Sequence, residues 1–144
     1  MPRRILVLLA LLLPTFVRAA ETASVPWHGA PNAAVAVARA QQKMLLVYYR
    51  GDCGRCSAAS DAMFENAASD EIFVKALDSF LPLRVDATTA AHPIVDALRT
   101  EKKVPVVAIY DADDPCAVEW VKNAEAVSGE LWQTLAVRRK GVGR

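Results

Sequence analysis

Two cysteines separated by two residues, Cys53 and Cys56, are the feature of this 144-residue sequence with the clearest capacity for chemistry. If both lie in a helix, they share one helical face. Their Cα atoms can then approach to the roughly 5–6 Å that a disulfide requires. The same spacing also serves zinc sites, so the surrounding sequence has to distinguish redox chemistry from metal binding.

The residues before the cysteines predict a buried strand that ends in a tight turn. Residues 44–49 form an apolar run of strand length with β-branched and aromatic side chains, and residues 50–52 interrupt it. From Cys53 onward the side chains are small and suit a helix packed closely against a sheet. We therefore expect Cys53 in the first turn of a helix, with Cys56 one turn later.

Position at the start of a helix should make Cys53 the more reactive thiol. The first N–H groups of a helix have no partner within it, and the helix dipole is positive there. The pKa of the Cys53 thiol should therefore fall below the ~8.5 of a free cysteine. Arg55 adds positive charge nearby, whereas the carboxylate of Asp52 opposes that effect. We expect Cys53 to be the nucleophile and Cys56 the resolving thiol, with Asp52, Gly54 and Arg55 as tuning residues.

The segments around this motif resemble the thioredoxin-like superfamily, in particular its secreted domains. The matching pieces are AAVAVARAQQKMLLVYYRGDCGRC, MFENAASDEIFVKAL, LPLRVDA and KVPVVAIYD, and the resemblance covers about residues 27–137. The resemblance implies an α/β thioredoxin-like fold, with a central mixed β-sheet flanked by helices and the CxxC at a helix N-terminus. It also implies a thiol–disulfide oxidoreductase that acts on protein thiols and disulfides, with no cofactor and no metal.

Val104 and Pro105 are the second specific part of the resemblance. An X–Pro bond is more often trans than cis, but in thioredoxin-like proteins a proline at this place is cis and faces the CxxC. The resemblance therefore implies substrate-binding roles, with Val104 pairing with the substrate backbone and Pro105 leaving space beside the sulfurs.

Three positions depart from the family pattern. Asp52 stands where a tryptophan is usual, and Gly54-Arg55 stands where thioredoxin itself has Gly-Pro. The buried acid that assists proton transfer in thioredoxin would fall near Val47, where no acid is present. The resemblance therefore leaves the reduction potential, the rate and the choice of partner open.

Residues 1–20 have the pattern of a signal peptide. Arg3 and Arg4 precede an apolar stretch over residues 5–17, and small residues follow at a suitable cleavage site. The stretch is shorter than the roughly 20 residues of a transmembrane helix, although an uncleaved anchor is the alternative. Export, to the periplasm in a Gram-negative host, would permit disulfides. Electrons would then pass to or from a membrane-bound thiol donor or oxidase.

The remainder corresponds to one domain, predicted over residues 27–140. Of the 17 basic and 16 acidic residues, three basic ones fall in the signal peptide, which leaves a net charge near −2. This balance argues against nucleic acid as a partner. Periodicity predicts helices over residues 31–42, 70–80, 93–99 and 128–140, and strands over residues 81–86, 106–110 and 116–121. Ser69 is the expected N-cap of the second of these helices, and Pro82 should delay regular strand pairing.

Two other function classes stay open at this point. The domain could be a non-catalytic accessory module with a structural disulfide, or a metal carrier that uses the CxxC. Only Cys116, His28 and His92 could add metal ligands, and none has a recognisable ligand spacing. Cys116 is the odd cysteine, either a half-buried free thiol or a partner for another chain or for redox chemistry.

Overall fold

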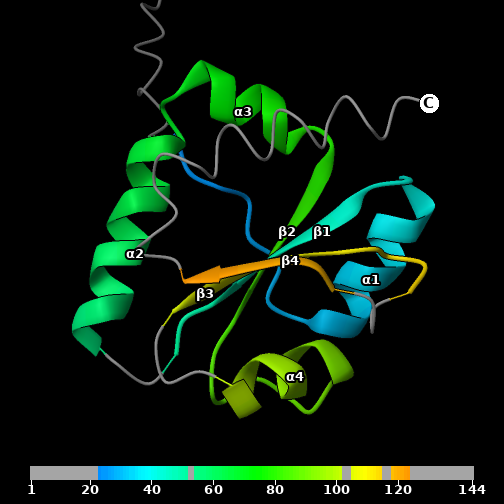
Figure 1. The fold of residues 1–144 in the computed structure, drawn as a ribbon. Helices are drawn as coiled ribbons and strands as arrows, with labels where there is room; N and C mark the ends of the chain where they lie inside the picture. Colours follow the sequence, from blue (N-terminus) through cyan, green and yellow to red (C-terminus); the bar gives the residue numbers. More distant parts are fainter. Residues whose placement is uncertain (1–22, 52–53, 102–104, 115–117, 124–144) are drawn as a thin grey trace, which may run out of the picture.

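The computed structural model describes residues 23–51, 54–101, 105–114 and 118–123. In chain order these residues form α1 (Pro31–Ala40), β1 (Met44–Tyr49), α2 (Gly54–Ala67), α3 (Glu71–Leu77), β2 (Phe80–Val85), α4 (Pro93–Glu101), β3 (Val106–Tyr110) and β4 (Val118–Asn123) (Figure 1). The predicted order of helices and strands is therefore confirmed within them. The predicted signal peptide and the predicted helix over residues 128–140 lie outside the described residues, as do Asp52, Cys53, Val104 and Cys116.

The strands form a mixed sheet in the order β2-β1-β3-β4, counted over the residues that the structure describes. β1 pairs with β2 in parallel and with β3 antiparallel, and β3 pairs antiparallel with β4. The continuous apolar sequence of β1 fits its central place, because both faces of this strand are covered. The predicted mixed sheet flanked by helices is confirmed.

Successive side chains of β1 enter two separate cores because they alternate between the faces of the sheet. Leu45, Val47 and Tyr49 pack with buried residues of α1 and α4. Leu46 and Tyr48 pack with buried residues of α2 and α3 on the opposite face. Figure 1 shows the sheet between these two pairs of helices.

Pro82 does not delay strand pairing, so that expectation was wrong. β2 begins at Phe80, and Pro82 pairs with Leu46 in the β1–β2 register. The carbonyl oxygen of Pro82 accepts a hydrogen bond from the His28 N–H at 2.9 Å, on the side of β2 away from β1. The missing N–H of Pro82 faces the same way, so no bond of the β1–β2 ladder is lost.

Residues 23–30 form no regular strand, and α3 begins differently from the prediction. His28 forms an isolated parallel bridge with Leu83, the only bridge that residues 23–30 make among the described residues. The N-cap of α3 is Asp70, not Ser69 as predicted, because the Asp70 carboxylate accepts from the Ile72 N–H at 2.8 Å. No helix in the described ranges is both long and apolar enough to span a membrane.

Candidate active site

Cys56 lies in the first turn of α2, the helix that directly follows the central strand. It is half-buried and is part of a disulfide. Gly54 and Arg55, the other described residues of the motif, are exposed at the start of the same helix. The motif is therefore oxidised at Cys56 and borders solvent. Cys53 and Asp52 fall outside the described residues.

The turn from β1 into the motif depends on a glycine. The Arg50 N–H donates to the Val85 carbonyl at 2.9 Å, which ends the β1–β2 pairing. Gly51 follows with a φ of 70°, in the left-handed region that residues with a Cβ rarely adopt. This conformation turns the chain away from the sheet immediately before the motif.

Ser57 connects the start of α2 to the end of β1. Its buried hydroxyl Oγ donates a hydrogen bond to the Arg50 carbonyl at 2.7 Å. Since Ser57 is the residue after Cys56, this bond fixes the helical side of the motif against the strand that precedes it.

Asp61 of α2 accepts hydrogen bonds from two side chains at the end of β1, beside this turn. Its Oδ1 accepts from the Tyr48 hydroxyl at 3.0 Å, and its Oδ2 accepts from the Arg50 guanidinium at 2.7 Å. Ser57 and Asp61 are four residues apart on α2 and therefore share the face that packs on the sheet. The Tyr48–Arg50–Asp61 cluster thus couples the motif helix to β1 through side chains.

The cluster changes the proton affinity of two of its members. The pKa of Tyr48 is raised to about 12, mainly by burial and also by the charge of Asp61 and the hydrogen bond to it. The hydrogen bond to Asp61 raises the pKa of Arg50 above its usual value. Tyr48 therefore remains a neutral donor, and Arg50 remains charged, throughout the physiological pH range.

Asp61 was not among the site residues predicted from the sequence. The position expected for a buried acid is Val47, whose fully buried side chain belongs to the core under α1 and α4. Asp61 instead approaches from α2, on the other face of the sheet, where Tyr48 lies. The sequence does contain a pattern that could have indicated this contact. Ser57 and Asp61 are four residues apart and so share one face of a helix, and Tyr48 and Arg50 are two residues apart and so share one face of a strand.

The sheet register brings Pro105 to the same edge as the motif. Pro105 is buried and directly precedes β3. Val106, the first residue of β3, pairs with Tyr49, the last residue of β1. Pro105 is therefore at the end of the sheet from which the chain enters the motif. Val104 and its bond to Pro105 lie outside the described residues.

His92 has a structural role through its ring, and His28 has one through its backbone. The His92 Nδ1 accepts from the Ile94 N–H at 3.2 Å at the start of α4, and the His28 backbone bonds to β2. Over the described part of the chain, no group of three histidine, cysteine or acidic side chains is arranged to hold a metal ion.

An apolar pocket of about 370 Å³ lies at the other end of the sheet. Its lining includes Lys43 and Phe80, which stand at the beginnings of β1 and β2, together with Val74 and Leu77 of α3. Because the motif follows the opposite end of β1, this pocket is separate from the candidate active site.

Comparison with families of known proteins gives a match. A family model described as thioredoxin-like matches residues 26–112, more than half of the chain. No curated protein and no solved structure matches. The matched range includes β1, the motif, Asp61 and all of β3.

Proposed function

The chain belongs to the thioredoxin-like family, and from this premise we propose that it is a thiol–disulfide oxidoreductase that exchanges disulfides with protein substrates. The observation that carries the proposal is the disulfide of Cys56 in the first turn of α2, directly after the central strand. We assign Cys53 as the partner of Cys56, because its position three residues earlier suits a disulfide at a helix start.

In the reducing direction, the Cys53 thiolate attacks one sulfur of a substrate disulfide. The substrate S–S bond breaks, and the departing sulfur leaves as a thiolate that takes up a proton. The Cys56 thiolate then attacks the Cys53 sulfur of the mixed disulfide. This step forms the Cys53–Cys56 disulfide and releases the second substrate thiol, so that the substrate gains two electrons and the motif loses two. The reverse sequence oxidises a substrate.

The residues around the motif have supporting roles in this proposal. The Ser57 bond to Arg50 and the Tyr48–Arg50–Asp61 cluster hold α2 so that the motif stays at the end of the sheet. Asp52, Gly54 and Arg55 tune the thiolate. Val104 and Pro105 receive the extended backbone of the substrate, a role that draws support from the place of Pro105 beside the end of β1.

We further propose that residues 1–20 direct export and are then removed. In a Gram-negative host the mature protein would act in the periplasm, where disulfides persist, and exchange electrons with a membrane-bound thiol donor or oxidase. Sequencing the N-terminus of the protein from the periplasmic fraction tests this: a mature chain that begins near residue 20 is expected, and an intact Met1 would contradict cleavage.

Trapping tests the catalytic proposal. A Cys56→Ser variant cannot resolve the mixed disulfide, so substrates should remain linked to Cys53 through a bond that dithiothreitol releases. The double variant Cys53→Ser/Cys56→Ser should trap none. Cys116→Ser, combined with Cys56→Ser, is the matched control for the third thiol and should trap as many partners as Cys56→Ser alone.

Exchange with glutathione separates the enzyme from the other function classes. The wild-type motif should equilibrate with a glutathione redox buffer, with a Cys53 thiol that titrates below the ~8.5 of a free cysteine. A pair that neither exchanges with glutathione nor traps a partner would show that the disulfide is structural and that the domain is an accessory module. Copper(I) or zinc bound by the reduced protein, and lost in Cys53→Ser, would instead identify a metal carrier.

A further inference from the structure

A polar pocket of about 380 Å³ opens beside the candidate active site. The pocket is lined by residues 27–29, by the ends of β1 and β2, and by the loop after β2. The lining includes Trp27, Arg50, Arg84, Asp86 and Thr88. In a sheet with parallel strands, ligands commonly bind at the carboxyl ends of the strands. Its volume lies within the range of small ligand pockets, roughly 300–1,000 Å³.

Two arginines line this pocket and supply its guanidinium hydrogen-bond donors. The Arg84 side chain is exposed, and no hydrogen bond or ion pair ties it to another residue in the described part of the chain. The Arg50 side chain is 38% exposed although one of its terminal nitrogens binds Asp61. Since a guanidinium has five N–H donors and no acceptor, both residues retain donors for a ligand.

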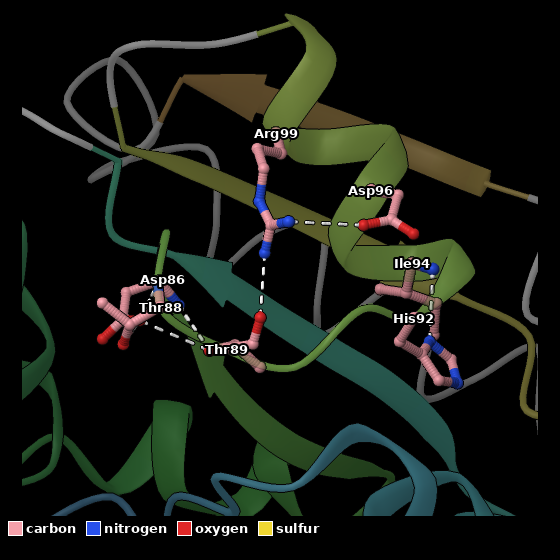
Figure 2. A network of polar contacts seen from close by, with 7 residues as sticks. All are labelled: Asp86, Thr88, Thr89, His92, Ile94, Asp96 and Arg99. Atoms are coloured by element: carbon pink, nitrogen blue, oxygen red, sulfur yellow. Dashed lines mark hydrogen bonds and ion pairs between the residues drawn. The ribbon is translucent and has the colours of Figure 1, made fainter.

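Asp86 places one negative charge in the pocket wall, and its carboxylate is hydrogen-bonded within its own loop. Its Oδ1 accepts from the Thr88 N–H at 2.8 Å and from the Thr88 hydroxyl at 2.6 Å. These hydrogen bonds lower the pKa of Asp86, so it is a fixed anion at neutral pH. Figure 2 shows this loop and the hydrogen bond that Arg99 of α4 donates to the Thr89 carbonyl at 2.9 Å. This wall of the pocket is therefore preformed.

The pocket is joined to the motif through Arg50. The Arg50 side chain lines the pocket, and its carbonyl accepts the hydrogen bond from Ser57, the residue after Cys56. Trp27 also lines the pocket and packs against Tyr48 in a tilted contact with ring centroids 5.7 Å apart. A group held between the two arginines would thus lie next to the turn that carries the motif.

We propose that this pocket binds a carboxylate of the substrate polypeptide, from an aspartate or glutamate close to the cysteine under attack. This inference rests on the proposed function and narrows its substrate class to disulfides with acidic flanking sequence. Arg84 is the main specificity-determining residue because its guanidinium has no partner among the described residues, and Arg50 lines the same pocket. Arginine suits this role because it can bind a carboxylate with two parallel hydrogen bonds.

Two matched peptides test the proposal. Each carries one disulfide, flanked by glutamate in one peptide and by glutamine in the other. At low ionic strength, with reduced glutathione as the electron donor and the uncatalysed rate subtracted, the wild-type protein should reduce the glutamate peptide with a kcat/KM about threefold to tenfold higher than that for the glutamine peptide. Arg84→Gln should bring this ratio close to one, and Arg84→Lys should keep part of it. Lys75→Gln removes the same charge from the exposed surface of α3 and should leave the ratio unchanged.

Added salt and a non-reactive peptide complete the test. The preference should shrink as salt rises above ~0.1 M, where the screening length is about 10 Å. The glutamate peptide with serines in place of cysteines should bind more tightly than its glutamine counterpart, read out by tryptophan fluorescence, and Arg84→Gln should abolish the difference. Exchange on both peptides at equal rates would overturn the pocket assignment and leave the proposed function standing. Absence of exchange would contradict the proposed function, and the binding measurement would then decide the pocket by itself.

Discussion

At the scale of single residues, the feature that matters most is a carboxylate that accepts from two donors. Asp61 binds Tyr48 with one oxygen and Arg50 with the other, directly below the turn into the motif. The ionic bond is partly exposed, so its own energy is modest. The hydrogen bond from Tyr48 is the stronger constraint, because the Tyr48 side chain is only 1% exposed and its hydroxyl is costly to leave unpaired.

Tyr48→Phe should lower the free energy of unfolding by about 1 kcal/mol at neutral pH, since Asp61 loses a buried donor. Because the Tyr48 pKa is raised to about 12 in the folded protein, the unfolded chain releases this proton first as the pH rises. The stabilisation is therefore fully present below about pH 10 and is lost as the pH approaches about 12.

Urea unfolding of wild type and Tyr48→Phe at several pH values checks the direction of this pH dependence. Between about pH 9 and about pH 11, the free energy of unfolding of wild type should fall by about 1.3 kcal/mol more than that of Tyr48→Phe. The stability advantage of wild type should therefore disappear over this range. Comparing the two proteins cancels the titration of all other groups. A stability difference that stays constant over this range would show that the Tyr48 hydroxyl titrates normally.

At the scale of elements, short polar contacts fix where the helices begin. α2 is attached to β1 by the Ser57 hydroxyl, and α4 begins where His92 accepts from the Ile94 N–H. α3 is only seven residues long, so its start depends strongly on its cap. The Asp70 carboxylate supplies that cap and also lies favourably at the positive end of the helix dipole.

Asp70→Ala should therefore destabilise the protein by about 1 kcal/mol. Ser69→Ala is the matched control, because Ser69 is exposed and precedes the cap, and it should change stability by less than about 0.5 kcal/mol. Thermal or urea unfolding of the two variants measures the difference. Equal losses for both, or a larger loss for Ser69→Ala, would show that α3 begins one residue earlier.

At the scale of the whole molecule, one sheet separates two hydrophobic cores. The core under α1 and α4 contains Leu83 and Val47, and the core under α2 and α3 contains Phe64 and Phe73. Both share β1, so neither core can open without disturbing the strand that leads into the motif. Trp27 extends the second core with an edge-on contact to Phe64, with ring centroids 5.0 Å apart.

Leu83→Ala should lower the free energy of unfolding by about 2 to 5 kcal/mol, because Leu83 is fully buried and the cavity cannot close. Ile72→Ala removes an aliphatic side chain that is 65% exposed and should cost less than about 1 kcal/mol. Unfolding of Leu83→Ala followed by both tryptophan fluorescence and circular dichroism should give a single shared transition. Two separate transitions would show that the two cores unfold independently.

Local patterns in the sequence were enough to predict most of the architecture. The apolar run of β1, the alternation in β2 and the periodicity of α1 and α4 appear in the structure where expected. These features follow from burial and backbone preference, which act over a few neighbouring residues. The prediction for Pro82 was wrong because the outer edge of β2 pairs with the His28 backbone, which is distant in the sequence. The prediction for Ser69 was wrong because two adjacent residues can cap a helix, and Asp70 is the one that does.

By itself, the sequence determined the family, the cysteine pair and the strand–turn–helix unit that carries Cys56. Only the tertiary structure showed that Asp61 reaches Tyr48 and Arg50, and that Arg50 and Arg84 line one pocket. For Asp61 the physical reason is the packing of α2 on β1. For the arginines it is the register of β1 with β2, which pairs Tyr48 with Arg84 although 35 residues separate them in the sequence. Such pairings depend on how the strands align in three dimensions, and no local pattern in the chain encodes them.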